Sequence, residues 1–139
     1  MLVITLGDPL SINIEIVASY FELDPHKILH KHPVVLLGNL WHYQDQIQRF
    51  SLPKTPMEIV RGVDNLRKPG LYFWDLPSRQ EPATKLSSQE RGQLAVSALQ
   101  KSVELDPPKK YAVLTCPINK SNCSQAGYDF PGQRSEEHT

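Results

Sequence analysis

Short apolar runs alternate with helix-like segments along this chain, and that alternation limits its fold more than any other feature. Five runs read as strands, at residues 2–5, 33–37, 57–60, 71–74 and 111–115. Turn-forming residues such as Gly7 and Gly38 follow them, as is typical where a buried strand ends. Strands that alternate with helices predict an α/β domain with a mostly parallel sheet.

The first expected helix begins near Ser11, whose hydroxyl can cap it. It ends at Asp24 and Pro25, because the residue before a proline disfavours helical backbone. Apolar residues three and four positions apart predict one buried face. The residues of that face are Ile12, Ile16, Val17, Tyr20 and Phe21.

Three more helices are expected. One covers residues 40–50, and a short one covers about 121–126 and is closed by Gly127. The clearest follows Ser87, because Ser87 and Glu90 have the spacing of a capping box. The apolar stripe predicted for that helix consists of Leu94, Ala95, Ala98, Leu99 and Val103.

Composition excludes several classes of protein. The 139 residues contain 15 Lys and Arg against 15 Asp and Glu, and this zero net charge argues against a nucleic-acid partner. No run approaches the roughly 20 apolar residues of a membrane helix, so no membrane association is predicted. Two cysteines, Cys116 and Cys123, form no disulfide framework, which favours a cytoplasmic location.

Two loops directly follow predicted strands, at residues 7–13 and 116–122. Ligands of open α/β sheets bind at the carboxyl ends of the strands, so these loops are the candidate site. In the first loop, a glycine turn before a helix is a general anion site. The alternative is a turn in which Asp8 binds its own backbone, and the residues alone favour this alternative.

The second loop offers two polar side chains for binding. Asn119 could orient a substrate, and Lys120 could contact a phosphate or carboxylate. A solvated lysine beside a turn explains Lys120 equally well. Cys116 is interpreted as a small buried residue, because the sequence places no histidine to activate it as a nucleophile.

A histidine-rich segment follows the first helix. His26 and His30 are four residues apart, with His32 close behind, so a zinc site is conceivable. Lys27 and Lys31 lie between them and would repel a cation. A solvated basic surface is therefore the favoured interpretation.

Four short segments, taken together and in order, resemble the 4-hydroxythreonine-4-phosphate dehydrogenases of the vitamin B6 pathway. The first segment, Ile-Thr-Leu-Gly-Asp-Pro followed by Glu-Ile, is similar to that family's N-terminal motif. The third, which ends Pro-Ile-Asn-Lys, is similar to its Thr-Ala-Pro-Ile-Asn-Lys. The segments are residues 4–9 with 15–16, 92–95, 111–120 and 126–132.

The resemblance implies an enzyme that oxidises and then decarboxylates 4-phosphooxy-threonine, a small phosphorylated hydroxy acid, with NAD or NADP. It also implies a divalent metal (Zn, Mg or Co), a homodimer, and the two-domain α/β/α fold of isocitrate and isopropylmalate dehydrogenases. A paralogous dehydrogenase for a phosphorylated sugar acid is one alternative. A non-catalytic α/β binding module is another.

The resemblance covers only the N-terminal part of the family, over residues 1–133. The family's three metal-binding histidines lie beyond residue 139, so this chain is expected to hold neither metal ligands nor catalytic residues, and to be inactive alone. The roles that the family implies here are in substrate binding. They fall on Asp8, Asn119, Lys120 and Gln133, the last at the family's histidine position.

Two departures from the family pattern stand out. Ser11, Asn13 and Ile14 occupy positions where the family has Gly, Gly and Pro, and a side chain there hinders close approach of a ligand. Residues 134–139 resemble the translation of a common sequencing adapter. We therefore expect the match to end at Gln133 and the last six residues to be non-native.

Overall fold

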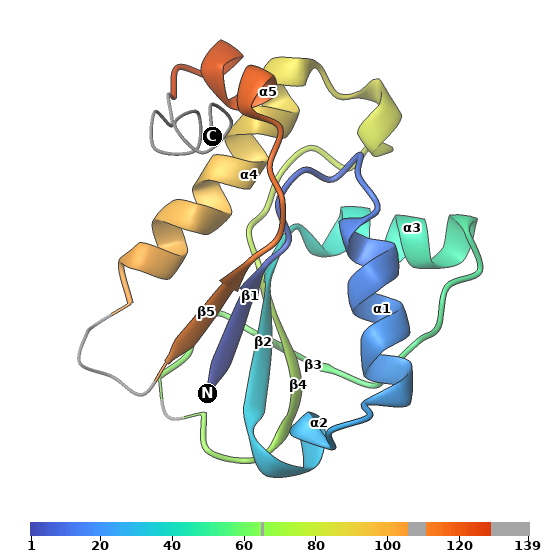
Figure 1. Ribbon diagram of the computed structural model, residues 1–139. Coiled ribbons are helices and arrows are strands. Elements are labelled where there is room, and N and C mark those ends of the chain that lie inside the picture. The colour runs from blue at the N-terminus through green and yellow to red at the C-terminus, as the bar shows by residue number, and fades with distance from the viewer. Residues whose placement is uncertain (65, 106–110, 129–139) are drawn as a thin grey trace, which may run out of the picture.

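Five strands form one sheet, and helices lie on both of its faces (Figure 1). The computed structural model describes residues 1–64, 66–105 and 111–128. The strands are β1 (Leu2–Thr5), β2 (Pro33–Gly38), β3 (Glu58–Val60), β4 (Gly70–Asp75) and β5 (Ala112–Thr115). The helices are α1 (Asn13–Leu23), α2 (Ile28–Lys31), α3 (Leu40–Arg49), the 3₁₀ helix η1 (Ala83–Lys85), α4 (Ser88–Val103) and α5 (Lys120–Gln125).

The strand order is β3-β4-β2-β1-β5, and each neighbouring pair is parallel. The predicted α/β class and parallel sheet are therefore confirmed. Parallel pairing also brings the carboxyl ends of all five strands to one edge of the sheet, where the two candidate loops lie. The second domain that the family resemblance implies stays a prediction.

The middle strands are apolar without interruption because both faces of the sheet are covered. On one face, Leu36 is in register with Phe73, and both side chains are fully buried. On the other face, Val3 is in register with Val35, and these are fully buried too. Burial of an aliphatic or aromatic side chain of this size contributes about 1.5–3 kcal/mol to stability.

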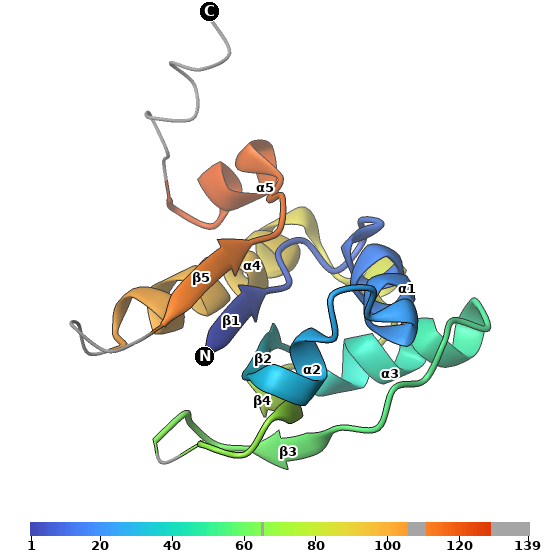
Figure 2. The same ribbon diagram turned by 60° about the horizontal axis from the view of Figure 1, so that its bottom comes forward.

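Different helices cover the two faces (Figure 2). Helices α1 and α3 pack on the face of Phe73, where burial raises the pKa of Tyr43 to about 12. Helix α4 packs on the face of Val3 through Ala98, and α5 packs against α4. Within the described ranges no helix is both long and apolar enough to cross a membrane.

The predicted buried face of α1 is partly wrong. Val17 and Phe21 are buried as expected, but Ile12 and Ile16 are 64% and 54% exposed. The helix turns Asn13, Ile14 and Ala18 inward instead. Ile16 and Leu23 extend the apolar surface of α1 well beyond the buried face, so spacing did not select the inward residues uniquely.

The predicted cap of α1 is also wrong. Ile12 occupies the N-cap position, without a side-chain hydrogen bond. The Ser11 hydroxyl donates to the Asp8 carbonyl at 2.7 Å and accepts from the Asn13 N–H at 3.2 Å. Ser11 therefore stabilises the preceding turn, and the N-cap lies one residue later than expected.

The capping box of α4 is confirmed. The Ser87 hydroxyl accepts from the Glu90 N–H at 3.0 Å, and the Glu90 carboxylate accepts from the Ser87 N–H at 2.9 Å. The predicted stripe is only partly buried, since Ala95 and Ala98 point inward while Val103 is 78% exposed. Gly92, Val96 and Ser102 complete the inward face.

Candidate functional site

The loops that follow β1 and β5 are in direct contact, because these strands are parallel neighbours. Gly7 turns the first loop with φ of +69°, a conformation that glycine adopts without strain. A Cβ atom at Gly7 would lie 2.4 Å from the Pro117 carbonyl oxygen. Glycine is thus required both for the turn and for the close approach of the second loop.

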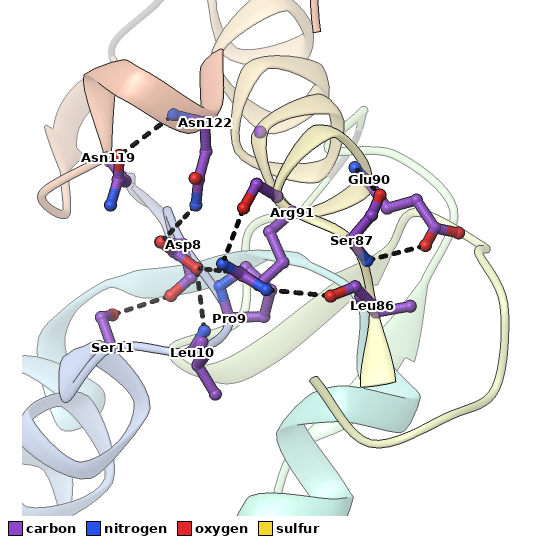
Figure 3. Close-up of polar contacts among 12 residues, drawn as sticks. Asp8, Pro9, Leu10, Ser11, Leu86, Ser87, Glu90, Arg91, Asn119 and Asn122 are labelled. Carbon is purple, nitrogen blue, oxygen red and sulfur yellow. Dashed lines mark hydrogen bonds and ion pairs between the residues drawn. The ribbon is translucent and has the colours of Figure 1, made fainter. Parts of the chain in front are cut away.

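Asp8 is the centre of the polar contacts between these loops (Figure 3). Its Oδ1 accepts from the Leu10 N–H at 2.9 Å, which closes a turn within the first loop. Its Oδ2 accepts from the Asn122 side-chain amide at 3.2 Å, which connects this loop to α5. One carboxylate therefore holds two segments that lie 114 residues apart in the sequence.

Arg91 adds the first turn of α4 to this cluster. Its Nε lies 3.8 Å from Asp8 Oδ1, and the two side chains are only 16% and 12% exposed. Its Nη1 donates to the Leu86 carbonyl at 2.9 Å, and its Nη2 donates to the Ser88 hydroxyl at 3.4 Å. The guanidinium is thereby fixed between the start of α4 and the first loop, as Figure 3 shows.

Asn13 closes the space between the two loops from the other side. Its side-chain amide donates to the Leu6 carbonyl at 3.0 Å and to the Pro117 carbonyl at 2.9 Å, and the residue is 3% exposed. The side chain thus fills the position that a glycine would leave open. The geometry favours a self-supporting turn at Asp8 over an anion site at the start of α1.

The second loop uses Asn119 in its own structure. The Asn119 side chain accepts from the Asn122 N–H at 3.0 Å and so caps α5. Lys120, the first residue of α5, is half-buried, and its Nζ is shielded from solvent. Gln133 and residues 134–139 lie outside the described part of the chain.

Sequence reasoning did not assign a role to Asn122 or Arg91. Asn122 lies within the loop that was singled out, but its partner Asp8 is distant in the sequence. Arg91 follows Glu90 of the capping box, and its position in the first turn of α4 predicts an exposed side chain. A different signal was present at Gly92, since a glycine inside a helix usually has a packing reason.

That packing reason is the contact between α4 and α5. A Cβ atom at Gly92 would lie 2.1 Å from the Asn122 carbonyl oxygen. Close approach of the backbones buries Cys123 completely, and burial together with the negative charge of Asp8 raises the pKa of its thiol. Cys116 was predicted to be buried and is half-buried. Burial raises the pKa of its thiol as well. A raised pKa disfavours the reactive thiolate, so neither thiol is activated as a nucleophile.

The histidines do not form a metal site in the described residues. His26, His30 and His32 are exposed, and no group of three or more His, Cys, Asp or Glu side chains in the described ranges could hold a metal ion. His42 is 1% exposed, and burial lowers its pKa, opposed in part by the Glu81 backbone and the charge of Asp45.

A groove of about 270 Å³ lies beside the first loop, between α1, α3 and η1. Its ionisable lining residues are Glu15, Asp45 and Arg49, and Arg49 forms an ion pair with Asp45 at 3.0 Å. The described lining therefore carries a net negative charge. The second loop, residues 116–122, contains one charged side chain, that of Lys120.

Comparison with known proteins finds a sequence relative in the family that the four segments resemble. A curated relative from Zymomonas mobilis, named 4-hydroxythreonine-4-phosphate dehydrogenase, is 29% identical over 133 residues. The match covers 95% of this chain and 38% of the relative, so the chain spans about two fifths of the relative's length. No protein-family model matches the chain.

Solved structures agree in fold. A Salmonella typhimurium protein described as a candidate 4-hydroxythreonine-4-phosphate dehydrogenase superimposes with a TM-score of 0.78 and 26% identity, over 94% of this chain and 41% of that one. The enzyme of that name from Burkholderia phymatum superimposes with a TM-score of 0.74 and 21% identity, over 94% and 40%. The predicted resemblance to this family is confirmed.

Proposed function

We propose that this chain forms part of a dehydrogenase that oxidises 4-phosphooxy-threonine with NAD or NADP and a divalent metal, in the synthesis of pyridoxal phosphate. The relative of that name, 29% identical along 95% of this chain, carries the proposal. The agreement in fold with a protein similarly described supports it. Homodimer formation and a cytoplasmic location are parts of the same proposal.

The described residues do not fit the metal. They offer no group of three potential ligands, so no chemical step at a metal is derived for this chain. Zinc, magnesium or cobalt would act on the substrate hydroxyl as a Lewis acid. Its ligands would have to come from polypeptide outside the described residues.

The role proposed for this chain is in binding the substrate. Lys120 is the only cationic residue in the two loops, 7–13 and 116–122. It follows the Asn119 cap at the carboxyl end of β5, where ligands of parallel sheets bind. In this proposal Lys120 binds an anionic group of the substrate. Asp8 positions the second loop through its hydrogen bond with Asn122. Gln133 stays a predicted contact.

The test begins with the coding sequence beyond codon 133. The protein encoded by the complete reading frame is purified, and NAD(P)H formation is followed with 4-phosphooxy-L-threonine and Zn²⁺, Mg²⁺ or Co²⁺. Turnover supports the proposal, with Lys120→Ala raising KM at least tenfold. Lys101→Ala is the matched control, because Lys101 lies on the exposed side of α4 beside Glu104.

Other outcomes favour the alternatives. Turnover with a phosphorylated sugar acid but not with 4-phosphooxy-L-threonine would identify the paralogous dehydrogenase. A folded, metal-loaded protein that reduces neither NAD nor NADP with either substrate would contradict the proposal. The binding-module alternative predicts that the 139-residue chain is monodisperse, unfolds cooperatively and binds no hydrophobic dye.

A further inference from the structure

The chain reverses its direction at the end of α3. Ser51 has φ of 51°, in the left-handed region. The Leu52 N–H donates to the Ile47 carbonyl at 2.9 Å, and the Ser51 N–H donates to the Gln48 carbonyl at 3.4 Å. These are the two hydrogen bonds of a Schellman motif, which ends a helix and turns the chain. The segment that joins α3 to β3 therefore runs back beside the helix (Figure 2).

A groove of about 510 Å³, here named the outer groove, lies between α3 and this returning segment. Its volume is typical of a small-molecule site, for which the range is roughly 300–1,000 Å³. Residues 52–57 form no helix or strand, and Pro53 and Pro56 lie among them. Proline fixes φ and favours extended backbone in the residue before it. The segment therefore passes along the groove without coiling into it.

The outer groove is separate from the groove of about 270 Å³ beside the first loop. The residues that α3 contributes to the outer groove are Tyr43, Gln44, Ile47 and Gln48. Those that it contributes to the other groove are Asp45, Gln46, Arg49 and Phe50. With 3.6 residues per turn, these two sets lie on opposite sides of the helix. The outer groove therefore shares no surface of α3 with the groove beside the first loop.

The floor of the outer groove is apolar. Tyr43 and Ile47 belong to the core under α1 and α3 and are 4% and 6% exposed, and Met57 packs against the same core. All three also line the groove. Because burial raises the pKa of Tyr43 to about 12, its hydroxyl carries no charge at neutral pH. The floor thus offers apolar surface without charge.

The polar side chains of the outer groove are not engaged elsewhere. Gln44 and Gln48 are exposed one turn apart on α3, and Lys54 and Thr55 lie opposite them on the returning segment. In the described ranges, none of these four side chains forms a hydrogen bond or ion pair with another residue. Lys54 is also the only charged residue in the described lining. Amide donors, amide acceptors and one positive charge are therefore available to a ligand.

We propose that the outer groove binds a small organic anion, a molecule with a flat apolar body and one carboxylate or phosphate group. The apolar body packs on the floor, and the anionic group pairs with Lys54. The amides of Gln44 and Gln48 bind polar substituents of the ligand, since each amide both donates and accepts. None of these residues lies in the two loops of the candidate site, so the proposal is independent of the proposed function.

The test titrates the 139-residue chain with four ligands of similar shape and different charge. These are benzoate, phenyl phosphate, neutral benzamide and cationic benzylamine. Binding is followed by NMR, through the side-chain amide signals of Gln44 and Gln48 and the backbone amide of Lys54. We expect the anions to shift these signals and to bind about fivefold more tightly than benzamide, as one exposed ion pair allows. Added salt should weaken binding of the anions only. The tighter of the two anions distinguishes a carboxylate ligand from a phosphate.

Matched variants locate the site. Lys54→Gln removes the charge and should lower the affinity for the anions about fivefold, to that of benzamide. Lys101→Gln is the same substitution beside Glu104 on α4 and should change nothing. Gln48→Glu places a carboxylate in the groove at an exposed position, so it should reverse the preference in favour of benzylamine. Arg49→Gln, on the opposite side of α3, should leave the preference for anions unchanged.

Three results would overturn the proposal. One is the absence of shifts at Gln44, Gln48 and Lys54 with both anions up to their solubility limits. Another is equal affinity for the anions and benzamide, which would make the groove an apolar surface without charge selection. The third is anion binding that Lys54→Gln and Gln48→Glu both leave intact, which would place the ligand elsewhere on the chain. Because the readout is binding, each result can be obtained whether or not the enzyme activity is found.

Discussion

The centre of the sheet and its β5 side are stabilised by different kinds of contact. In the centre, fully buried apolar side chains such as Phe73 and Leu36 pack between the helix layers. On the β5 side, the strand is exposed, and polar bridges from Asp8 and Asn13 add to the backbone pairing with β1 and the packing of α5 on α4. Burial of apolar area is roughly additive, whereas a polar bridge depends on a few atoms in a fixed geometry. We therefore expect local unfolding to begin on the β5 side.

The largest effect is expected in the centre. Phe73→Ala removes a fully buried ring that packs against Tyr43, and should lower the free energy of unfolding by about 3–5 kcal/mol. Leu114→Ala on β5 is the comparison, since its side chain is 55% exposed. It should lower the free energy by less than about 1 kcal/mol. Urea unfolding measures both, and similar losses would remove the distinction between the two regions.

The next largest effect is expected where α4 meets α5. Gly92→Ala forces a methyl group into the Asn122 carbonyl, 2.1 Å away, so the helices must separate. We expect a loss of about 3 kcal/mol and faster amide exchange throughout α5. Gly62→Ala is the control, because nothing lies within 4 Å of a Cβ there. Unchanged exchange in α5 would show that the contact is not needed to hold that helix.

A smaller loss is expected from the polar bridge between the loops. Asn13→Ala leaves the carbonyls of Leu6 and Pro117 without this donor, and should lower the free energy of unfolding by about 2 kcal/mol. Exchange should rise in α5 more than in α3, because the bridge serves only the β5 side. Ser124→Ala, an exposed substitution on α5, should change neither quantity. An equal rise of amide exchange in α3 would show that Asn13 stabilises the whole core and not the β5 side in particular.

The sequence predicted the strands and helices well on both sides of the sheet, β5 and α5 included, but not the contacts that join the two loops, for a physical reason. Strands, turns and the capping box at Ser87 depend on neighbours within a few residues, so their signals are local. The Asp8–Asn122 bridge joins residues 114 positions apart, and each alone reads as an ordinary turn or helix residue. The buried face of α1 was mispredicted for another reason, since apolar residues such as Ile16 also lie outside the face that packs on the sheet.

The smallest effect is a pH dependence at His42, a buried residue of α3. Burial lowers the pKa of His42 below its value of 6.5 in the unfolded chain, although the Glu81 backbone and Asp45 oppose this shift. Stability is therefore fully present above pH 6.5. It falls as the pH decreases below 6.5, because only the unfolded chain then takes up the proton. A loss on the order of 1 kcal/mol is expected between pH 7 and pH 5.5. His42→Gln should flatten this slope and His30→Gln, at an exposed site, should not. An unchanged slope in His42→Gln would assign the proton uptake to another group.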